Sequence, residues 1–292
     1  MATVRLATRG SAQALTQAEA VAARLADAGV ESTLVVVETH GDRTQAMNVP
    51  LHTIGGQGVF CKEVQAAVID GRADAAVHSA KDLPTDTDPR LVIGAFTTRR
   101  DAADALIGRP MSSLAAGATI ATGSVRRRAQ LGRARPDLVF DELRGNIHTR
   151  LERIPDQGAI VMAVAALQVL GLTDRIAERL DPAEFVPAVG QGCVALECRR
   201  DDSSTRRALS EIDDPITRYE VEIERAFLGE LGSGCALPVG AYVDGPMLST
   251  FLASDDRHIV ISETVELAGE PEADQARART AATDARRRVD AG

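Results

Sequence analysis

Apolar and polar positions alternate with two different periods along the first hundred residues. Four apolar runs are typical of strands, and two stretches have helical spacing (4–8, 34–39, 75–79 and 91–96; 11–28 and about 60–70). In the first helix, Ala14, Ala18, Val21 and Leu25 form an apolar stripe, and Ser11 is suited to cap it. Strands that alternate with helices predict a mostly parallel sheet with helices on both faces.

The same pattern begins again in the second hundred residues. Further strands are predicted over 118–124, 138–145 and 159–167, the last passing into a helix. After Pro187, glycines permit a sharp bend before a strand over 194–198, which we expect to cross back to the first lobe. The chain is therefore predicted to be α/β, with two doubly wound lobes, a crossing hinge and a cleft at the carboxyl ends of the strands.

The last third of the chain has a different pattern. A helix over about 216–231 is followed by three strand-like runs at hairpin spacing (237–243, 247–253 and 258–266) and by a final helix. This order predicts a small C-terminal α+β domain with a three-stranded antiparallel sheet. We expect three domains in all: a first lobe, a second lobe and the C-terminal domain (1–98 plus 193–214; 99–192; 215–292).

Composition is that of an ordinary globular protein. The 292 residues are 45% hydrophobic and 26% charged, which allows two or three domains with sizeable cores. No apolar run reaches membrane-spanning length, and the N-terminus has no apolar signal region, so we expect a cytoplasmic protein. The four cysteines have no CxxC spacing, which argues against a disulfide framework and against a zinc site. We expect no bound metal and, by default, a monomer.

Positive charge is concentrated in one part of an acidic chain. The formal net charge is −9, which disfavours general nucleic-acid binding. Residues 122–153 nevertheless contain eight arginines against four acids. This cluster predicts a confined anion site; the alternative is an arginine-rich helix face that makes surface ion pairs.

Two strand ends carry polar residues where a helix begins. Arg9 and Ser11 follow the first strand, and Thr122 and Ser124 precede a helix whose first turn contains a pair of arginines, Arg126 and Arg127. Backbone N–H groups and the helix dipole attract anions at such a position and disfavour cations. The arginines are therefore expected to face a bound anion, although Ser11 is equally explained as a simple helix cap.

A Lys-Asp pair ends the apolar run 75–79 and is followed by Pro84. Only two of the 33 basic residues are lysines, Lys62 and Lys81, so a lysine beside Asp82 is not a generic surface charge in this chain. We interpret Asp82 as a candidate catalytic carboxylate with Lys81 as its cationic neighbour. The alternative is a solvated turn in which Asp82 only caps the chain ahead of Pro84.

Cys235 follows Gly232 and Gly234 in a predicted loop, whereas Cys61, Cys193 and Cys198 lie in segments patterned as buried helix or strand. An uncrowded thiol in a flexible loop is the candidate reactive cysteine. The alternative is a small apolar side chain beneath a loop, which is the commoner role of a lone cysteine.

Seven segments, in register along nearly the whole chain, resemble the porphobilinogen deaminase family, also called hydroxymethylbilane synthases: LATRGS, GGQGVFCKE, AAVHSAKDLP, ATGSVRRRAQL, LRGNIHTRL, VGQGCVALECR and SGCALPVG. The resemblance implies a cytoplasmic transferase of tetrapyrrole and heme biosynthesis. Such an enzyme polymerises four porphobilinogen molecules, with release of ammonia, into the linear tetrapyrrole hydroxymethylbilane. The chain grows on a covalently bound dipyrromethane primer, in a protein with two periplasmic-binding-protein-like lobes.

The resemblance also implies roles for individual residues. Cys235 would hold the dipyrromethane cofactor through a thioether, and Asp82 would be the catalytic carboxylate. A further set would bind the carboxylates of the cofactor and of the growing chain (Lys81, Arg9, Arg126, Arg127, Arg144, Arg150, Ser11, Thr122 and Ser124). Three positions depart from the family pattern: Val169 replaces an arginine, Gln57 a lysine and Gly10 a larger residue.

Two other functions compete with this one. A two-lobed α/β protein can be a non-catalytic small-anion-binding module, but such a protein has no need of a reactive Cys235. A cysteine hydrolase would require one of the five histidines within hydrogen-bond reach of Cys235 (His40, His52, His78, His148 or His258).

Overall fold

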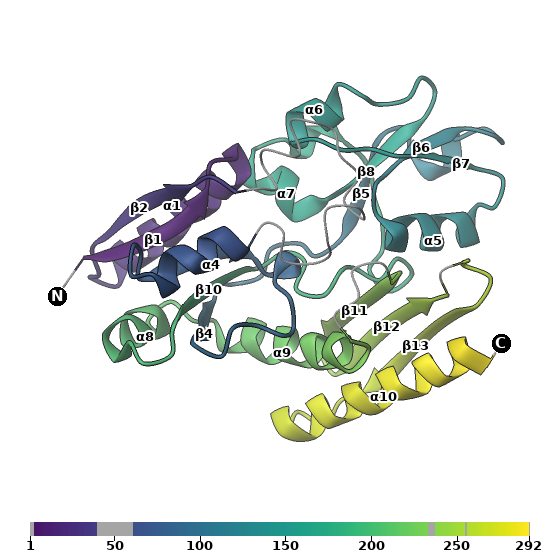
Figure 1. Ribbon diagram of the computed structural model, residues 1–292. Helices are drawn as coiled ribbons and strands as arrows, with labels where there is room; N and C mark the ends of the chain where they lie inside the picture. The colour runs from purple at the N-terminus through teal and green to yellow at the C-terminus, as the bar shows by residue number, and fades with distance from the viewer. Residues whose placement is uncertain (1–2, 40–60, 233–236, 255, 292) are drawn as a thin grey trace. The chain divides into compact units, whose positions relative to one another are not determined.

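A computed structural model of the chain describes residues 3–39, 61–232, 237–254 and 256–291 (Figure 1). The chain divides into two compact units, one formed by Met1–Arg100 with Gly192–Tyr219 and the other by Asp101–Gln191 with Glu220–Gly292. The division falls within helix α9 (Pro215–Glu230). Each unit is therefore described by itself.

The first unit contains a five-stranded sheet in the order β2-β1-β3-β10-β4. Its strands are β1 (Val4–Arg9), β2 (Ser32–Val37), β3 (Ala75–Ser79), β4 (Leu91–Phe96) and β10 (Val194–Arg199). Its helices are α1 (Ala12–Asp27), α4 (Lys62–Ile69), the 3₁₀ turn η1 (Ala80–Asp82) and α8 (Ser203–Ser210). Strand β1 is parallel to β2 and to β3, while β10 is antiparallel to both of its neighbours.

Helices cover both faces of this sheet. Ala75 and Val77 of β3 face the cluster that includes Leu25 of α1 and Leu209 of α8, whereas the intervening Ala76 packs with Val64 of α4. The alternation follows from the two-residue period of a strand. It confirms the predicted α/β layering, and β10 enters the first sheet as the sequence predicted.

The second unit contains another five-stranded sheet, in the order β7-β6-β8-β5-β9. Its strands are β5 (Asp104–Gly108), β6 (Thr119–Ala121), β7 (Val139–Asp141), β8 (Ala159–Ala163) and β9 (Ile176–Arg179). Its helices are η2 (Met111–Ser113), α5 (Val125–Ala134), α6 (Ile147–Leu151), α7 (Val164–Val169) and η3 (Thr173–Arg175). Strands β6, β7 and β8 are parallel, as predicted, whereas the sequence pattern did not predict β5 and β9.

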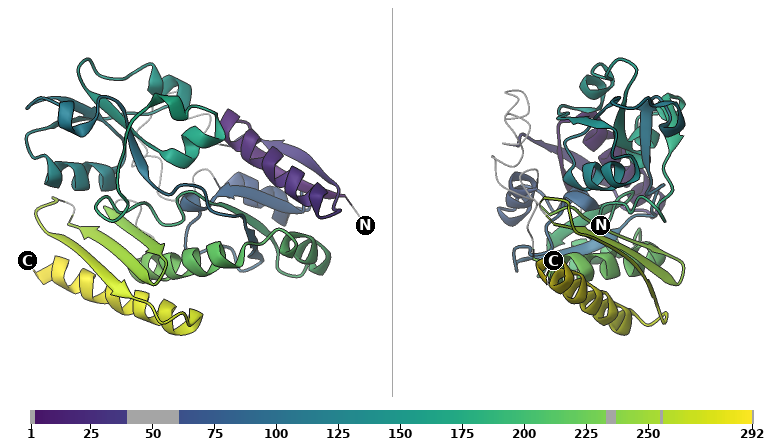
Figure 2. Two further views of the ribbon diagram at one scale, coloured as in Figure 1. Left: turned by 180° about the vertical axis from the view of Figure 1, so that it is seen from behind. Right: turned by 90° about the vertical axis from the view of Figure 1, so that its right-hand side faces the viewer.

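A three-stranded antiparallel sheet and a long helix complete the second unit. The strands β11 (Val239–Asp244), β12 (Met247–Ala253) and β13 (Val260–Glu266) pair in chain order, which confirms the predicted C-terminal α+β fold. Helix α10 (Pro271–Ala291) lies along this sheet in both views of Figure 2. It buries small residues at helical spacing (Ala278, Ala282 and Ala285). Among the described helices, none is long and apolar enough to cross a membrane.

A glycine fixes the close approach of two segments in the second unit. A Cβ atom on Gly158, just before β8, would overlap the Thr119 carbonyl oxygen at the start of β6.

We predict that Gly158→Ala lowers the free energy of unfolding by about 1–3 kcal/mol, because backbone atoms must move apart. Gly132→Ala is the control: it lies in α5, where a Cβ would make only ordinary contact with Phe140, and is expected to raise stability by about 0.5–1 kcal/mol. Urea unfolding measures both, and equal effects would contradict the close approach.

Candidate active site

Asp82 lies in a turn that the surrounding chain fixes. Strand β3 ends at Ser79 and the chain enters the 3₁₀ turn η1, whose last two residues are Lys81 and Asp82. The next residue, Leu83, is 1% exposed and anchors the turn in the interior. The backbone carbonyl of Asp82 accepts a hydrogen bond from Sγ of Cys61, at 3.3 Å. The position of the Asp82 backbone is thus set from both sides.

The carboxylate of Asp82 is half-buried, and no described residue forms a hydrogen bond or an ion pair with it. In particular, no ion pair joins it to the adjacent Lys81 ammonium in the described structure. Both oxygens of the carboxylate remain able to accept hydrogen bonds from a bound molecule.

Arg9 and Ser11 lie at the same edge of the first sheet as Asp82. Strands β1 and β3 are parallel neighbours, so their carboxyl ends meet at one edge. Ser11 caps α1 as predicted, and its hydroxyl accepts a hydrogen bond from the backbone N–H of Ala14 at 3.3 Å. Arg9, the last residue of β1, is half-buried. The structure therefore groups three of the predicted site residues at this edge.

In the second unit, helix α5 begins at the predicted polar turn. Ser124 caps the helix by accepting a hydrogen bond from the Arg127 backbone N–H, and its own N–H donates to the Thr122 hydroxyl at 3.2 Å. Both hydroxyls therefore shape the turn. Arg126 and Arg127 follow in the first turn of the helix, where the helix dipole disfavours a cation.

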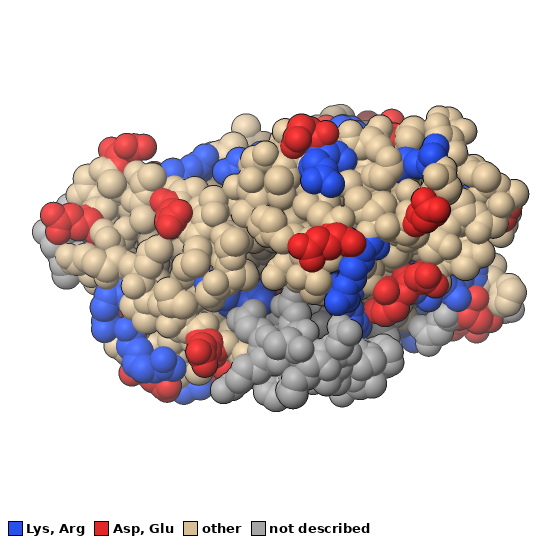
Figure 3. Space-filling model, turned by 90° about the horizontal axis from the view of Figure 1, so that it is seen from above, with Lys and Arg blue, Asp and Glu red and all other residues tan. Residues whose placement is uncertain are grey.

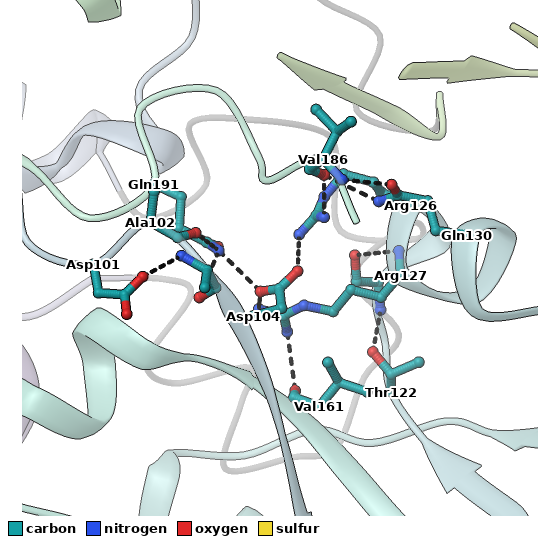
Figure 4. A network of polar contacts seen from close by, with 12 residues as sticks. Asp101, Ala102, Asp104, Thr122, Arg126, Arg127, Gln130, Val161, Val186 and Gln191 are labelled. Carbon is teal, nitrogen blue, oxygen red and sulfur yellow. Dashed lines mark hydrogen bonds and ion pairs between the residues drawn. The ribbon is translucent and has the colours of Figure 1, made fainter. Parts of the chain in front are cut away.

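A buried carboxylate that the sequence analysis missed holds both arginines (Figure 4). Asp104, the first residue of β5, is 1% exposed; one oxygen lies 2.7 Å from the Arg126 guanidinium and the other 2.7 Å from that of Arg127. Gln191 adds a third donor, at 2.9 Å from Asp104. The only signal in the sequence was an acid at the start of an apolar run, which does not identify a partner.

Arg126 and Arg127 differ in how many of their other guanidinium N–H groups form hydrogen bonds within the protein. Arg126 also donates to the Val186 carbonyl at 2.6 Å and is itself only 5% exposed. Arg127 donates to the Val161 carbonyl at 3.0 Å, and its buried Nε has no hydrogen-bond partner in the described structure. Arg127 therefore retains an unused donor, whereas Arg126 is held by interior groups.

Burial and charge pairing act in opposite directions on these groups. Burial raises the pKa of the Asp104 carboxyl, but the two guanidiniums outweigh it and hold that pKa well below its usual range. Burial lowers the pKa of Arg126, against the attraction of Asp104. Two guanidiniums share one carboxylate, so the group as a whole carries one excess positive charge.

The other predicted arginines of this unit lie near the carboxyl end of β7. Arg144 contacts Glu142 at 3.2 Å, and Nε of Arg150 in α6 donates to the Gly145 carbonyl at 2.7 Å. Gly123, in the turn before α5, lies so close to this segment that a Cβ there would come within 2.9 Å of the Leu143 carbonyl oxygen. The two turns therefore pack against each other, as expected where parallel strands end side by side.

Several predicted residues have other outcomes. Cys235, Gln57, His40 and His52 lie outside the described residues, so the predicted thiol and the hydrolase alternative are not tested by the structure. Cys61, Cys193 and Cys198 are buried, as predicted. At Gly10 a Cβ would make only ordinary contact with Val36, so nothing in the fold requires glycine there. Val169 is the half-buried last residue of α7.

Charges on the surface shown in Figure 3 are mixed in sign, with Lys and Arg side chains interspersed among Asp and Glu. Exposed pairs such as Arg90 with Asp88 are typical of such a surface and add little to stability. The described residues contain no group of three or more His, Cys, Asp or Glu side chains that could hold a metal ion.

Comparisons with known proteins agree with the resemblance seen in the sequence. Residues 4–207 match the family model "Porphobilinogen deaminase, dipyromethane cofactor binding domain", and residues 218–282 match "Porphobilinogen deaminase, C-terminal domain". The porphobilinogen deaminase of Xanthomonas oryzae pv. oryzae is 47% identical over 248 residues, which are 82% of this chain and 81% of the relative. The probable porphobilinogen deaminase of Methanopyrus kandleri is 39% identical over 280 residues, which are 92% of this chain and 93% of the relative.

Among solved structures, the methionine-binding protein MetQ matches with a TM-score of 0.45 and 13% identity, over 72% of this chain and 89% of that protein. A match of this strength adds nothing to the argument. The two family models together span most of the chain, and the two relatives are 47% and 39% identical over most of its length. The chain therefore belongs to the porphobilinogen deaminase family of enzymes and contains that family's dipyrromethane cofactor-binding domain.

Proposed function

We propose that this enzyme condenses four porphobilinogen molecules, with release of ammonia, into hydroxymethylbilane on a dipyrromethane primer. The observation that carries the proposal is the Asp82 carboxylate: it is half-buried, its backbone is fixed by Leu83 and Cys61, and no described residue neutralises it. A chain that only binds small anions gains nothing from an unneutralised carboxylate, because that charge repels its ligand.

Asp82 acts on charge that develops during the reaction. When the aminomethyl group of porphobilinogen loses ammonia, positive charge spreads to the pyrrole nitrogen. A carboxylate can accept a hydrogen bond from this N–H. The hydrogen bond strengthens as the positive charge grows, so it stabilises the transition state more than the substrate. The same carboxylate can transfer a proton to or from the aminomethyl nitrogen.

The arginines of the second unit suit the carboxylates of pyrrole substrates and of the cofactor. Each pyrrole ring carries an acetate and a propionate, and guanidinium groups bind carboxylates through two parallel N–H donors. The Asp104 cluster has one excess positive charge and a buried Nε of Arg127 with no described partner. Arg127, with the Thr122 and Ser124 hydroxyls, is therefore suited to an incoming carboxylate, and Asp104 fixes the direction of the guanidinium.

Arg9 and Lys81, at the edge of the first sheet that carries Asp82, supply positive charge for further carboxylates, as do Arg144 and Arg150 in the second unit. We assign the thioether attachment of the cofactor to Cys235. When bound, the dipyrromethane supplies the free pyrrole carbon to which the first substrate is joined. Anchoring keeps the growing chain on the enzyme, so that only one new porphobilinogen has to bind for each later condensation and the cost of binding the chain again is removed.

The proposal extends to partners and location. The substrate is porphobilinogen, and we propose a cytoplasmic monomer without a nucleic-acid partner. We also propose that the working domains are 1–98 plus 193–214, 99–192 and 215–292. The separate family match of residues 218–282 supports the last of these.

Replacing Asp82 tests the catalytic role. Asp82→Asn is expected to lower kcat by about 100- to 10,000-fold, because the amide carries no negative charge and cannot transfer the proton. The melting temperature should hardly change, since no described residue pairs with this carboxylate. Asp86→Asn, an exposed acid four residues further along the same loop, is the control and should keep normal turnover. Normal turnover in Asp82→Asn would remove Asp82 from the mechanism.

The cofactor assignment is tested by intact mass under denaturing conditions. The chain purified from cells that make porphobilinogen should carry an added mass equal to two deaminated porphobilinogen units, and Cys235→Ser should lack it. Cys61→Ser is the matched control and should keep the addition, because Cys61 is buried and its thiol donates a hydrogen bond to the backbone carbonyl of Asp82. An unmodified wild-type chain would favour the binding-module alternative.

Asp104 is expected to be essential for the second unit. Asp104→Asn leaves the buried Arg126 guanidinium without its carboxylate, which we expect to lower the free energy of unfolding at pH 7 by about 3–5 kcal/mol. The pKa of Asp104 is lowered in the folded state, so its contribution is complete above the usual Asp pKa of about 3.9 and is lost as the pH falls below that value.

Urea unfolding of both proteins from pH 7 to pH 3 measures this contribution. The stability difference between wild type and Asp104→Asn should be constant down to about pH 5 and should shrink below about pH 4. Asp137→Asn removes a carboxylate that pairs with Arg135 at the surface, and it should have little effect. Equal losses in the two variants would contradict the role of Asp104.

A further inference from the structure

A second buried carboxylate lies in the first unit, close to the strand that carries Asp82 into its turn. Glu197 of β10 is fully buried, and its Oε2 accepts a hydrogen bond from Nε2 of Gln65 on α4 at 2.7 Å. Nε2 of His78 lies 3.2 Å from the same oxygen, and the imidazole is 3% exposed. His78 is the next-to-last residue of β3, four positions before Asp82.

Strand register explains why these side chains meet. In the antiparallel pair β3 and β10, Ala76 faces Glu197 and His78 faces Ala195. Side chains two residues apart point to the same face of a sheet, so His78 and Glu197 are diagonal neighbours on one face. That face is covered by α4, because Ala76 packs with Val64 of this helix. Gln65 enters the cluster from the covering helix.

Helix α4 makes a second contact, directly with the Asp82 turn. Its N-terminal cap, Cys61, donates to the Asp82 carbonyl at 3.3 Å, and Gln65 follows one turn later on the same helix. One helix therefore contacts both the Glu197 carboxylate and the backbone of Asp82. The Glu197 carboxylate also contacts His78, close to the end of β3 at which the Asp82 turn begins. The cluster thus joins the two elements that fix the Asp82 backbone.

Stability alone does not explain a carboxylate at this position. Removing a carboxylate from water costs several kcal/mol, and a hydrophobic residue of similar size is often as stable or more stable. A carboxylate that accepts a hydrogen bond from Gln65 on one element and lies 3.2 Å from the His78 imidazole on another does, however, fix their relative position more narrowly than apolar packing does. The mechanism uses neither Glu197 nor His78 to touch the substrate, so a positioning role is the function left to them.

We propose that Glu197, with His78 and Gln65, is a positioning cluster that holds the β3 end and helix α4 in the arrangement that aims the Asp82 carboxylate. The inference rests on the catalytic role proposed for Asp82. A displacement of about 1 Å in a catalytic group can reduce the rate about 100-fold. Loss of the cluster should therefore lower turnover, while substrate binding through the arginines changes little.

Two substitutions of Glu197 separate positioning from packing. Glu197→Met keeps the length of the side chain but removes the acceptor for Gln65 and the oxygen that contacts His78, and kcat should fall about 10- to 100-fold. Glu197→Gln keeps an amide oxygen that can accept the Gln65 hydrogen bond and contact His78, so it should retain most of the turnover. In both variants KM should stay within about twofold of the wild-type value, because binding groups are untouched.

Leu209→Ala is the matched control for lost stability. Leu209 is fully buried against the opposite face of the same sheet, and its truncation is expected to lower the melting temperature without moving Asp82. If Glu197→Met does not fold, His78→Leu and His78→Gln make the same comparison, since a glutamine amide keeps a polar group next to the Glu197 oxygen and leucine does not. Steady-state kinetics on folded protein, with melting temperatures, gives all the values.

Three results would decide the matter. A kcat for Glu197→Met and for His78→Leu equal to that of wild type overturns the positioning role, and so does an equal fall of kcat in Leu209→Ala. A fall in the first two variants, with recovery in Glu197→Gln and His78→Gln, supports it. Normal turnover in Asp82→Asn is a separate result: it overturns the proposed function itself, whatever the Glu197 variants show.

Discussion

The second unit depends on one buried carboxylate, Asp104, which pairs with two arginines. Asp104 lies between two arginines in the second unit; Asp104 and Arg126 are buried and Arg127 is partly buried, so solvent screens these charges little. Burial of a lone carboxylate or of a lone guanidinium is strongly unfavourable, so each group is tolerated only because the others are present. The helix dipole opposes both arginines at the start of α5, and Asp104 is the charge that offsets it. The orientation of the arginine pair is therefore fixed by an interaction inside the unit.

The carboxylates of this chain have roles that follow from their surroundings. Asp104 and Glu197 are fully buried and are contacted by described donors on neighbouring elements. Asp82 is half-buried and has no such donor among the described residues. A paired carboxylate stabilises or positions the groups around it, whereas an unneutralised one is able to respond to charge that appears on a substrate. The same chemical group thus holds its neighbours in place at Asp104, while at Asp82 it is the catalyst that we propose.

The sequence predicted most of the elements that carry the site, because those elements have local signals. The first sheet, the caps Ser11 and Ser124, and the C-terminal hairpins follow from apolar period and from turn residues close in the chain. Strands β5 and β9 were missed, since they are short and their pairing partners are distant in sequence. The contacts of Asp104 with Arg126 and of Glu197 with Gln65 were missed for the same reason: 22 and 132 residues separate the partners. Segment motifs identified the family, but they do not show which charges are paired.

The arginine cluster shows why a count of charges cannot assign a role. The sequence of residues 122–153 is compatible with an anion site or with surface ion pairs. In the structure, some of these arginines form surface ion pairs, whereas others are held by an interior carboxylate. Arg135 pairs with Asp137 at the surface, and Arg128 contacts the half-exposed Glu142. Arg126 and Arg127 are instead held by a carboxylate from another strand, and their excess of one positive charge lies where β6 ends and α5 begins. A surface pair is already neutral and exchanges readily with water, so it has little to offer a ligand. A fixed guanidinium with an unused donor is already oriented before the ligand arrives, and this pre-organisation distinguishes the arginines suited to bind carboxylates from their neighbours in the same cluster.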